Sequence, residues 1–178
     1  MLDNIENSTL LMKKIATLLL FALTLPIAAQ KNEIKIDVFD VIALKSVDAT
    51  FERIINFESS VGVSILFNFE KESSSFRYNE EFVLTPYYRQ VLFSRGNIDY
   101  FGEFFGAINT GKVPIEDLEI GDDDTYTDFA LGLSFGGKYV SSSGFVADFH
   151  IGVGRNLFNT NPSPEVVPRV GIALGKQF

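Results

Sequence analysis

The stretch that decides the fold is VGVSILFNF, residues 61–69. Its large apolar side chains recur at every second position, at Val61, Val63, Ile65, Phe67 and Phe69. The positions between them are mostly small or polar. An apolar residue at every second position is the pattern of a β-strand with one apolar face. The stretch therefore predicts a strand whose two faces meet different surroundings.

The same alternation recurs in three later stretches, which are FALGLSF (129–135), FVADFHIGV (145–153) and RVGIALGKQF (169–178). Weaker alternation predicts four more strands, over residues 33–43, 47–55, 81–93 and 97–108. The total is eight predicted strands. Each has about the 9–11 residues that a tilted strand needs to cross a lipid bilayer.

The second face of these strands separates a soluble barrel from a membrane barrel. A soluble barrel turns its apolar side chains inward, so its other face is solvated and rich in Lys and Glu. Here the second face is mostly Gly, Ala and Ser with isolated charges. Small residues suit the inside of a narrow barrel, and large apolar residues suit lipid. The sequence therefore predicts an all-β fold, an eight-stranded antiparallel transmembrane β-barrel.

The lengths of the predicted connections agree with a barrel in a membrane, which has short turns at one end and longer loops at the other. The short connections are 56–60, 94–96 and 140–144. The long connections are 70–80, 109–126 and 156–167. The first connection, 44–46, is short where a loop is expected. We expect the long connections to face outward and to carry any surface interaction.

Residues 12–30, MKKIATLLLFALTLPIAAQ, have the pattern of a secretory signal peptide. Lys13 and Lys14 precede an apolar run over 15–25, and Ala28 and Ala29 supply small residues for cleavage. We predict a signal peptide over 1–30, with translation starting at Met12, and an outer-membrane barrel over 31–178.

The signal peptide, the eight strands and the final stretch together resemble the small outer-membrane β-barrel proteins of the OmpA/OmpX/OmpW type. More narrowly, the chain resembles a family of outer-membrane barrel proteins with no assigned function. The resemblance implies an integral protein of the Gram-negative outer membrane, whose partners are outer-membrane lipids and, during insertion, the barrel assembly machinery. It also implies that the last strand carries the assembly signal. The matching positions are Val170, Ile172, Leu174 and Phe178, whereas Lys176 departs from the pattern.

The inward positions of the predicted strands carry charge. They include Asp48, Glu52, Arg89, Asp99, Glu103, Lys138, Asp148, His150 and Arg169. Isolated buried charges are costly, so we expect these side chains to pair in an interior network. The turn at 94–96 folds the fourth strand onto the fifth and predicts an Arg89–Glu103 ion pair.

Three features fit the predicted strands badly. Pro86 has no N–H to give to a closed sheet, which predicts a bulge or a local break there. Asp40 falls on the apolar face of the first strand, which predicts a bulge near Val38 to Val41 or an Asp40 at headgroup level. Phe101 and Phe105 point inward, where space for large rings is short.

Several function classes are excluded by composition. The 178 residues carry a net charge of −8, which argues against a nucleic-acid partner, and the missing Cys excludes thiolate chemistry. With one His, a multi-His metal centre is excluded as well. We predict no catalytic residue, no metal and no cofactor. The acidic residues of 109–126 predict a solvated outer loop, with divalent-cation binding as the alternative.

The expected function is therefore a structural or surface-interaction role in the outer membrane, without enzyme activity. An eight-stranded barrel is just wide enough for side chains to fill, so a general pore is not expected. Three alternatives stay open. One is a narrow channel or transporter for small solutes. Another is a lipid-modifying enzyme using His150, with Asp148 on the same face and Ser134 as the nucleophile. The third is a soluble periplasmic β-barrel that binds an apolar ligand.

Overall fold

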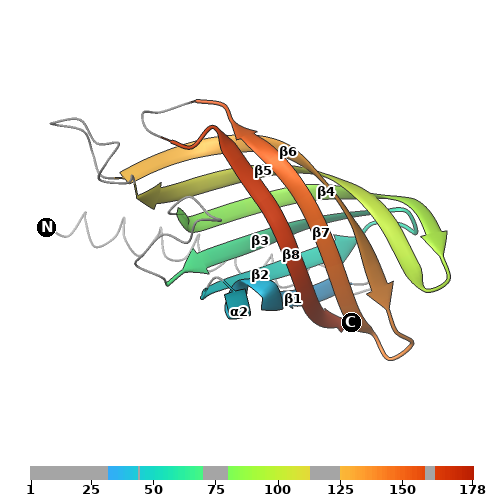
Figure 1. Ribbon diagram of the computed structural model, residues 1–178. Helices are drawn as coiled ribbons and strands as arrows, with labels where there is room; N and C mark the ends of the chain where they lie inside the picture. The colour runs from blue at the N-terminus through green and yellow to red at the C-terminus, as the bar shows by residue number, and fades with distance from the viewer. Residues whose placement is uncertain (1–31, 44, 70–79, 113–124, 159–162) are drawn as a thin grey trace, which may run out of the picture. The chain divides into compact units, whose positions relative to one another are not determined.

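The computed structural model describes residues 32–43, 45–69, 80–112, 125–158 and 163–178. Eight antiparallel strands form a closed barrel, in which each strand pairs with its sequence neighbours and β1 closes on β8 (Figure 1). The predicted all-β, eight-stranded fold is confirmed. The elements are β1 (Asn32–Asp37), α2 (Val38–Ala43), β2 (Ser46–Ile54), β3 (Ser59–Asn68), β4 (Glu80–Arg95), β5 (Ile98–Lys112), β6 (Thr125–Val140), β7 (Phe145–Asn156) and β8 (Val166–Gln177).

The two ends of the barrel differ in how the strands are joined. At one end, here called the turn end, the β2–β3, β4–β5 and β6–β7 connections are short. At the other, here called the loop end, the β3–β4, β5–β6 and β7–β8 connections are long, and α2 joins β1 to β2. The predicted alternation of short and long connections is therefore present in the barrel.

The apolar faces of the strands point outward. Leu133 on β6 is 55% exposed and Ile151 on β7 is 54% exposed, while the neighbouring Ser134 is fully buried in the interior. The alternation along the other strands follows the same rule, with small and charged residues inside. This arrangement is the opposite of that in a soluble barrel, which buries its apolar side chains.

Aromatic side chains flank the apolar belt on the outer surface at both ends. At the turn end, the rings of Phe93 and Tyr100 stack with centroids 4.7 Å apart. At the loop end, the Phe129 ring lies 6.5 Å from that of Phe158. On β6, Phe129 and Tyr139 are ten positions apart, which spans about 25 Å along the barrel axis at a rise of about 3.3 Å and a tilt of about 40°. That height matches the apolar band of transmembrane barrels.

Two aromatic rings that the sequence places inside the barrel do lie there, because glycines make room for them. Phe101 and Phe105 are both buried. A Cβ atom on Gly136 would stand 2.5 Å from the Phe101 ring, and one on Gly132 would stand 2.3 Å from the Phe105 ring. The glycine-rich inward face of β6 is therefore the counterpart of the aromatic inward face of β5.

The predicted first strand over 33–43 is wrong beyond Asp37, where the chain turns into the short helix α2. The Asp37 Oδ1 atom accepts hydrogen bonds from the backbone N–H groups of Phe39 (2.9 Å) and Asp40 (3.2 Å), so Asp37 caps the helix. Asp40 is buried within it. A helical turn, rather than a bulge or a headgroup contact, thus resolves the misplaced Asp40. Among the described residues, no helix is both long and apolar enough to cross a membrane.

Pro86 interrupts the pairing of β4 with β5 locally. The ladder pairs Leu84 with Ile108 and resumes at Tyr87 and Phe105 in the same register. The bulges of this ladder lie elsewhere, between Glu80 and Phe82 and between Val91 and Phe93. The local break expected at the proline is present, because Thr85 and Pro86 have no paired residue on β5.

Candidate functional site

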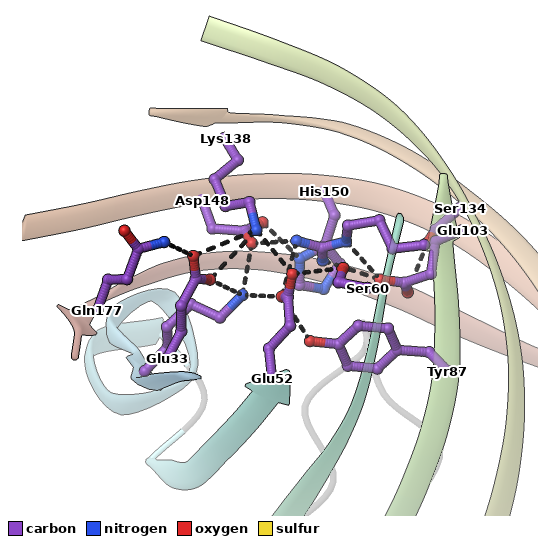
Figure 2. Close-up of polar contacts among 12 residues, drawn as sticks. Glu33, Glu52, Ser60, Tyr87, Glu103, Ser134, Lys138, Asp148, His150 and Gln177 are labelled. Carbon is purple, nitrogen blue, oxygen red and sulfur yellow. Dashed lines mark hydrogen bonds and ion pairs between the residues drawn. The ribbon is translucent and has the colours of Figure 1, made fainter. Parts of the chain in front are cut away.

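The chemistry of the described interior is concentrated in a network of eight charged side chains, four cations and four carboxylates. Figure 2 shows the contacts around its members Glu33, Glu52, Glu103, Lys138 and Asp148. The eight charged residues come from seven of the eight strands, and β3 adds a hydroxyl from Ser60. We call this set the charge network. Its cations are Lys35, Arg89, Lys138 and Arg169, and its carboxylates are Glu33, Glu52, Glu103 and Asp148.

Two lysines bind the carboxylates nearest the turn end. Lys35 Nζ lies 2.6 Å from Glu52 Oε2 and 2.8 Å from Asp148 Oδ2. Lys138 Nζ lies 2.6 Å from Glu52 Oε1 and 3.2 Å from Glu33 Oε2. Each lysine therefore bridges two acids that come from different strands. The cross-strand ion pairs fix the positions of β1, β2, β6 and β7 relative to one another.

Glu52 is the centre of this part of the network. Besides the two lysines, its carboxylate accepts hydrogen bonds from Ser60 Oγ (2.7 Å) and from the hydroxyl of Tyr87 (2.8 Å). The Tyr87 ring reaches Glu52 across Gly62, where a Cβ atom would stand 2.3 Å from the ring. A buried carboxylate is tolerated only when its lone pairs are filled, and here they are.

Arg89 connects the two halves of the network. Its guanidinium donates to Glu103 Oε2 (2.8 Å from Nη2), to Glu52 Oε2 (3.2 Å from Nη1) and to Asp148 Oδ2. The same group lies 3.7 Å from the centre of the Phe101 ring, where a cation meets the negative face of the π-system. Arg89 thus bonds to three carboxylates and packs on an aromatic ring.

Glu103 carries the network toward the loop end. Its Oε1 atom accepts hydrogen bonds from Ser134 Oγ (2.8 Å) and Arg169 Nε (2.8 Å). The Arg169 guanidinium lies within cation–π distance of the rings of Tyr87 (5.5 Å) and Phe105 (5.3 Å). Alternating cations and rings therefore fill the middle of the barrel.

The equal numbers of cations and carboxylates explain how so much charge is buried. Removing ions from water costs several kcal/mol each, and only close pairing with full hydrogen bonding offsets that cost. The side chains also fill the lumen, as expected for eight strands. The network therefore holds the strands together across the lumen.

The structure brings together six of the residues named from the sequence, with the Arg89–Glu103 pair among their contacts. The six are Glu52, Arg89, Glu103, Lys138, Asp148 and Arg169. His150 stands at the edge of the network, with its Nδ1 atom 3.7 Å from Asp148 Oδ1.

The placement of Asp99 in the network is wrong. Its Oδ1 atom accepts a hydrogen bond from Ser94 Oγ (2.6 Å) at the exposed β4–β5 hairpin. Asp99 keeps the inward alternation of Glu103 and stands opposite Lys138 on β6. It lies at the start of β5, however, and the Lys138 ammonium binds Glu33 and Glu52 instead.

Sequence reasoning missed Glu33, Lys35 and Tyr87 as members of the network. The signal was present for the first two, because Ile34 and Ile36 point outward and alternation then sends Glu33 and Lys35 inward. Tyr87 shares the inward alternation of Arg89, but its hydroxyl carries no charge, so a search for buried charges did not select it. Its role depends on the gap left by a glycine on the next strand.

The arrangement around His150 does not form a hydrolytic triad. Ser134 is buried and donates its hydroxyl to Glu103 rather than to His150. A serine nucleophile needs its hydroxyl within hydrogen-bond reach of the base. The acidic stretch considered for cation binding lies mostly outside the described residues, over 113–124.

An apolar belt outside and a compensated charge network inside an eight-stranded barrel define the class of small outer-membrane-type β-barrels. The expected resemblance to that class is confirmed at the level of the fold. Among solved structures, the chain is similar to Ail, the attachment invasion locus protein of Yersinia pestis, at a TM-score of 0.42 and 11% identity over 84% of this chain and 97% of that chain. No protein-family model and no curated protein matches the chain.

Proposed function

We propose that this chain is an integral outer-membrane β-barrel with a closed interior and a structural or surface-interaction role, served by its loop end. The observation that carries the proposal is the inverted distribution of side chains. Outward positions such as Leu133 and Ile151 are apolar and exposed, while the charge network lies inside. Exposed apolar area on this scale is stable only when another apolar phase covers it.

Membrane fractionation, combined with arginine substitutions at two depths along β6, tests the membrane placement. The protein is expected to stay in the membrane pellet after an alkaline wash and to need detergent for release. Leu133→Arg, in the middle of the belt, is expected to lower the free energy of unfolding in lipid by about 2–4 kcal/mol. Thr125→Arg, beyond the Phe129 girdle, is the control and should cost about 0–1 kcal/mol. Release without detergent, or equal effects of the two arginines, would contradict the proposal.

Closure of the interior separates this proposal from a channel. The charge network ties Lys35, Arg89 and Lys138 to carboxylates across the lumen. We expect no steady single-channel conductance in planar bilayers at any voltage that leaves the barrel folded. Defined conductance steps that disappear in a network variant would favour the narrow channel or transporter instead.

The absence of enzyme activity is also part of the proposal. The Ser134 hydroxyl is held by Glu103, and His150 faces Asp148 rather than a nucleophile. We expect His150→Ala to leave the lipid composition of the outer membrane unchanged by mass spectrometry. A lipid species that disappears in this variant would identify a lipid-modifying enzyme.

Export through a cleaved signal peptide is proposed from the sequence of residues 1–30, which lie outside the described residues. Mass measurement of the protein purified from membranes is expected to show a mature chain that begins near Lys31. A purified chain that retains residues 15–25 would overturn this processing.

The assembly signal is proposed for the outward side of β8 and the last residue, where Ile172, Leu174 and Phe178 are exposed. We expect Phe178→Ala to reduce the fraction of folded barrel in the outer membrane while leaving refolding of purified protein into vesicles unchanged. Phe145→Ala, another exposed ring at the same end, is the matched control. Equal behaviour of the two variants in cells would remove Phe178 from the signal.

A further inference from the structure

We propose that the outer surface of the barrel, near its turn end, carries a specific site for one anionic diacyl phospholipid. An acyl chain of the lipid lies in a hollow over β6 and β7, and its head-group phosphate lies between Arg95 and Lys176. The proposal rests on the membrane placement of the proposed function and adds to it a lipid class and a site. Three observations carry it, which are an unfilled hollow, a glycine that the packing of the chain does not require, and two cations without carboxylate partners.

The hollow lies on the lipid-facing side of the barrel and has a volume of about 560 Å³. Its floor includes two small outward residues, Gly137 on β6 and Ala147 on β7. The large outward side chains around this floor are those of Ile98, Tyr100, Phe135, Tyr139, Phe149, Ile151 and Ile172. Binding sites for small molecules are mostly apolar and have volumes of roughly 300–1,000 Å³. The hollow is therefore large enough and apolar enough to hold an acyl chain.

The register of the strands shows in which direction the hollow opens. On its loop side, Phe135 and Ile151 stand opposite each other and form a row of two large side chains across β6 and β7. On its turn side, Ile98 pairs with Tyr139, and Tyr139 pairs with Ala147. Ala147 is the smallest residue of that row. A chain in the hollow can therefore leave it over Ala147 toward the turn end, where the phosphate level of the bilayer is expected.

Gly137 is not required by the packing of the chain itself. An added Cβ atom at Gly137 would have its nearest heavy atom at 3.4 Å, in the side chain of Ile98. The adjacent inward residue differs, since a Cβ atom on Gly136 would stand 2.1 Å from the backbone oxygen of Phe149. Glycine weakens a strand unless a close approach requires it, for example by a ligand. The outward space at Gly137 is therefore available to a molecule that packs directly on the strand.

Two outward cations flank the turn end of the hollow. Arg95 on β4 pairs with Ile98, and because paired residues point to the same face, Arg95 points outward beside the wall of the hollow. Lys176 lies on the other side, on β8, and its ammonium donates a hydrogen bond to the backbone oxygen of Ser143 in the β6–β7 turn. An ammonium group has three N–H donors, so this bond leaves donors for a phosphate oxygen. The hollow therefore opens between two positive charges.

The charge balance at this end favours an anion from outside the chain. The outward cations of the loop end have carboxylate partners, and those pairs are Lys112 with Glu81 (3.5 Å) and Arg155 with Glu165 (2.6 Å). Within the described ranges, Arg95 and Lys176 form no ion pair with a carboxylate. Lysine and arginine near a membrane surface attract anionic lipids. A lipid with net negative charge supplies the missing counter-charge, and Lys176, which departs from the apolar pattern of the last strand, gains a role.

The chain contains no Trp, so a single introduced Trp reports on the lipid that contacts it. Phe149→Trp places this reporter in the wall of the hollow, and Ile65→Trp places it on β3, on the opposite side of the closed barrel. Each variant is reconstituted into phosphatidylcholine vesicles that contain a minor fraction of phosphatidylglycerol. Quenching is compared when the phosphatidylglycerol, or an equal amount of the phosphatidylcholine, carries brominated acyl chains. We expect at least a threefold preference for phosphatidylglycerol at Phe149→Trp and none at Ile65→Trp.

Substitutions in the background of the hollow reporter test its two parts. Lys176→Gln combined with Arg95→Gln is expected to abolish the preference. Arg53→Gln, which removes an outward cation of β2, is the matched control and should leave the preference unchanged. Gly137→Leu fills the hollow and should abolish the preference as well. Gly102→Leu, at an outward glycine that does not line the hollow and whose Cβ atom has room, should not.

The outcomes separate the site from the membrane placement. If brominated phosphatidylcholine quenches neither reporter, the belt does not meet lipid and the membrane placement fails. If both reporters are quenched but show the same ratio between the two lipids, the site is overturned. A preference that survives the loss of both cations would overturn the phosphate contact, and one that survives Gly137→Leu would overturn the place of the acyl chain.

Discussion

The turn half and the loop half of the barrel interior are built on different principles. In the turn half, Lys35, Arg89 and Lys138 join carboxylates from strands on all sides, and every strand there has two partners. In the loop half, α2 takes the place of β1, a small cavity remains, and the hydrogen bonds among the described residues include the neutral amide pair of Asn109 and Asn156. Cross-strand ion pairs hold the turn half together, whereas the loop half retains a small cavity.

The difference teaches how a barrel of this size combines stability with an accessible surface. A compensated charge network is costly to assemble but very costly to leave incomplete, so it holds the strands in one register. With the register fixed at one end, the other end can lose half a strand without losing closure. Function that needs access or motion is therefore expected at the loop end.

The largest effect on stability is expected from Arg89→Ala, which removes a cation from the charge network. The substitution leaves Glu52, Glu103 and Asp148 without the cation that they share. Breaking a buried ion pair by removing one partner costs about 3–5 kcal/mol. We expect a loss of that size in urea unfolding from vesicles, together with a lower temperature for the heat-induced gel shift.

Arg155→Ala provides the matched control for that prediction. Arg155 also pairs with a carboxylate, Glu165, at 2.6 Å, but its side chain is 68% exposed at the loop end. Exposed pairs contribute about 0.2–1 kcal/mol. If Arg89→Ala and Arg155→Ala lower the free energy of unfolding equally, the charge network does not stabilise the turn half as its geometry indicates.

A smaller effect is expected from Gly136→Ala, which tests the packing of the rings among the charges. The added Cβ would stand 2.1 Å from the backbone oxygen of Phe149 and 2.5 Å from the Phe101 ring, and the backbone atom cannot yield cheaply. Overpacking of this kind costs about 1–3 kcal/mol. Gly102→Ala is the control, since its Cβ would meet Leu92 and Phe135 at an ordinary 3.7 Å. Equal unfolding midpoints for the two alanine variants would refute the role of the glycine.

Much of the fold was predictable because strand alternation has a period of two and the two environments differ sharply. The outward residues of 61–69 and the inward positions of Glu103 and Asp148 follow from the alternation of side chains along each strand alone. The break at Asp37 was not predictable, because Ile34, Ile36 and Val38 continue the alternation that a strand requires. The helix forms there through a cap made by Asp37 itself, and the Asp37 carboxylate also bonds Ile172, 135 residues away.

The candidate site was predictable in its membership more than in its contacts. Parity places Glu52 and Arg89 in the lumen, and a short turn sets Arg89 opposite Glu103. Parity says nothing of which strand lies across the barrel, so the Arg89 contact with Asp148 on β7 emerges only from closure. The prediction that Asp99 joins the charge network was wrong, because the alternation of inward and outward residues does not show how far the network extends along the barrel axis.

The smallest effect is expected from Asp37→Ala, which acts on the attachment of α2 to β8 in the loop half rather than on the charge network. Asp37 Oδ1 accepts N–H groups from Phe39, Asp40 and Ile172, so its removal frees the start of α2 and the edge of β8 together. Loss of a helix cap costs about 0.5–2 kcal/mol, and Asp37→Asn should recover most of it. Because the charge network is untouched, hydrogen exchange should accelerate at Ile172 and within α2 but not at Glu52 or Glu103. Uniform acceleration of exchange across both halves would show that the barrel opens as one unit. The two halves would then differ in structure but not in their free energy of local opening.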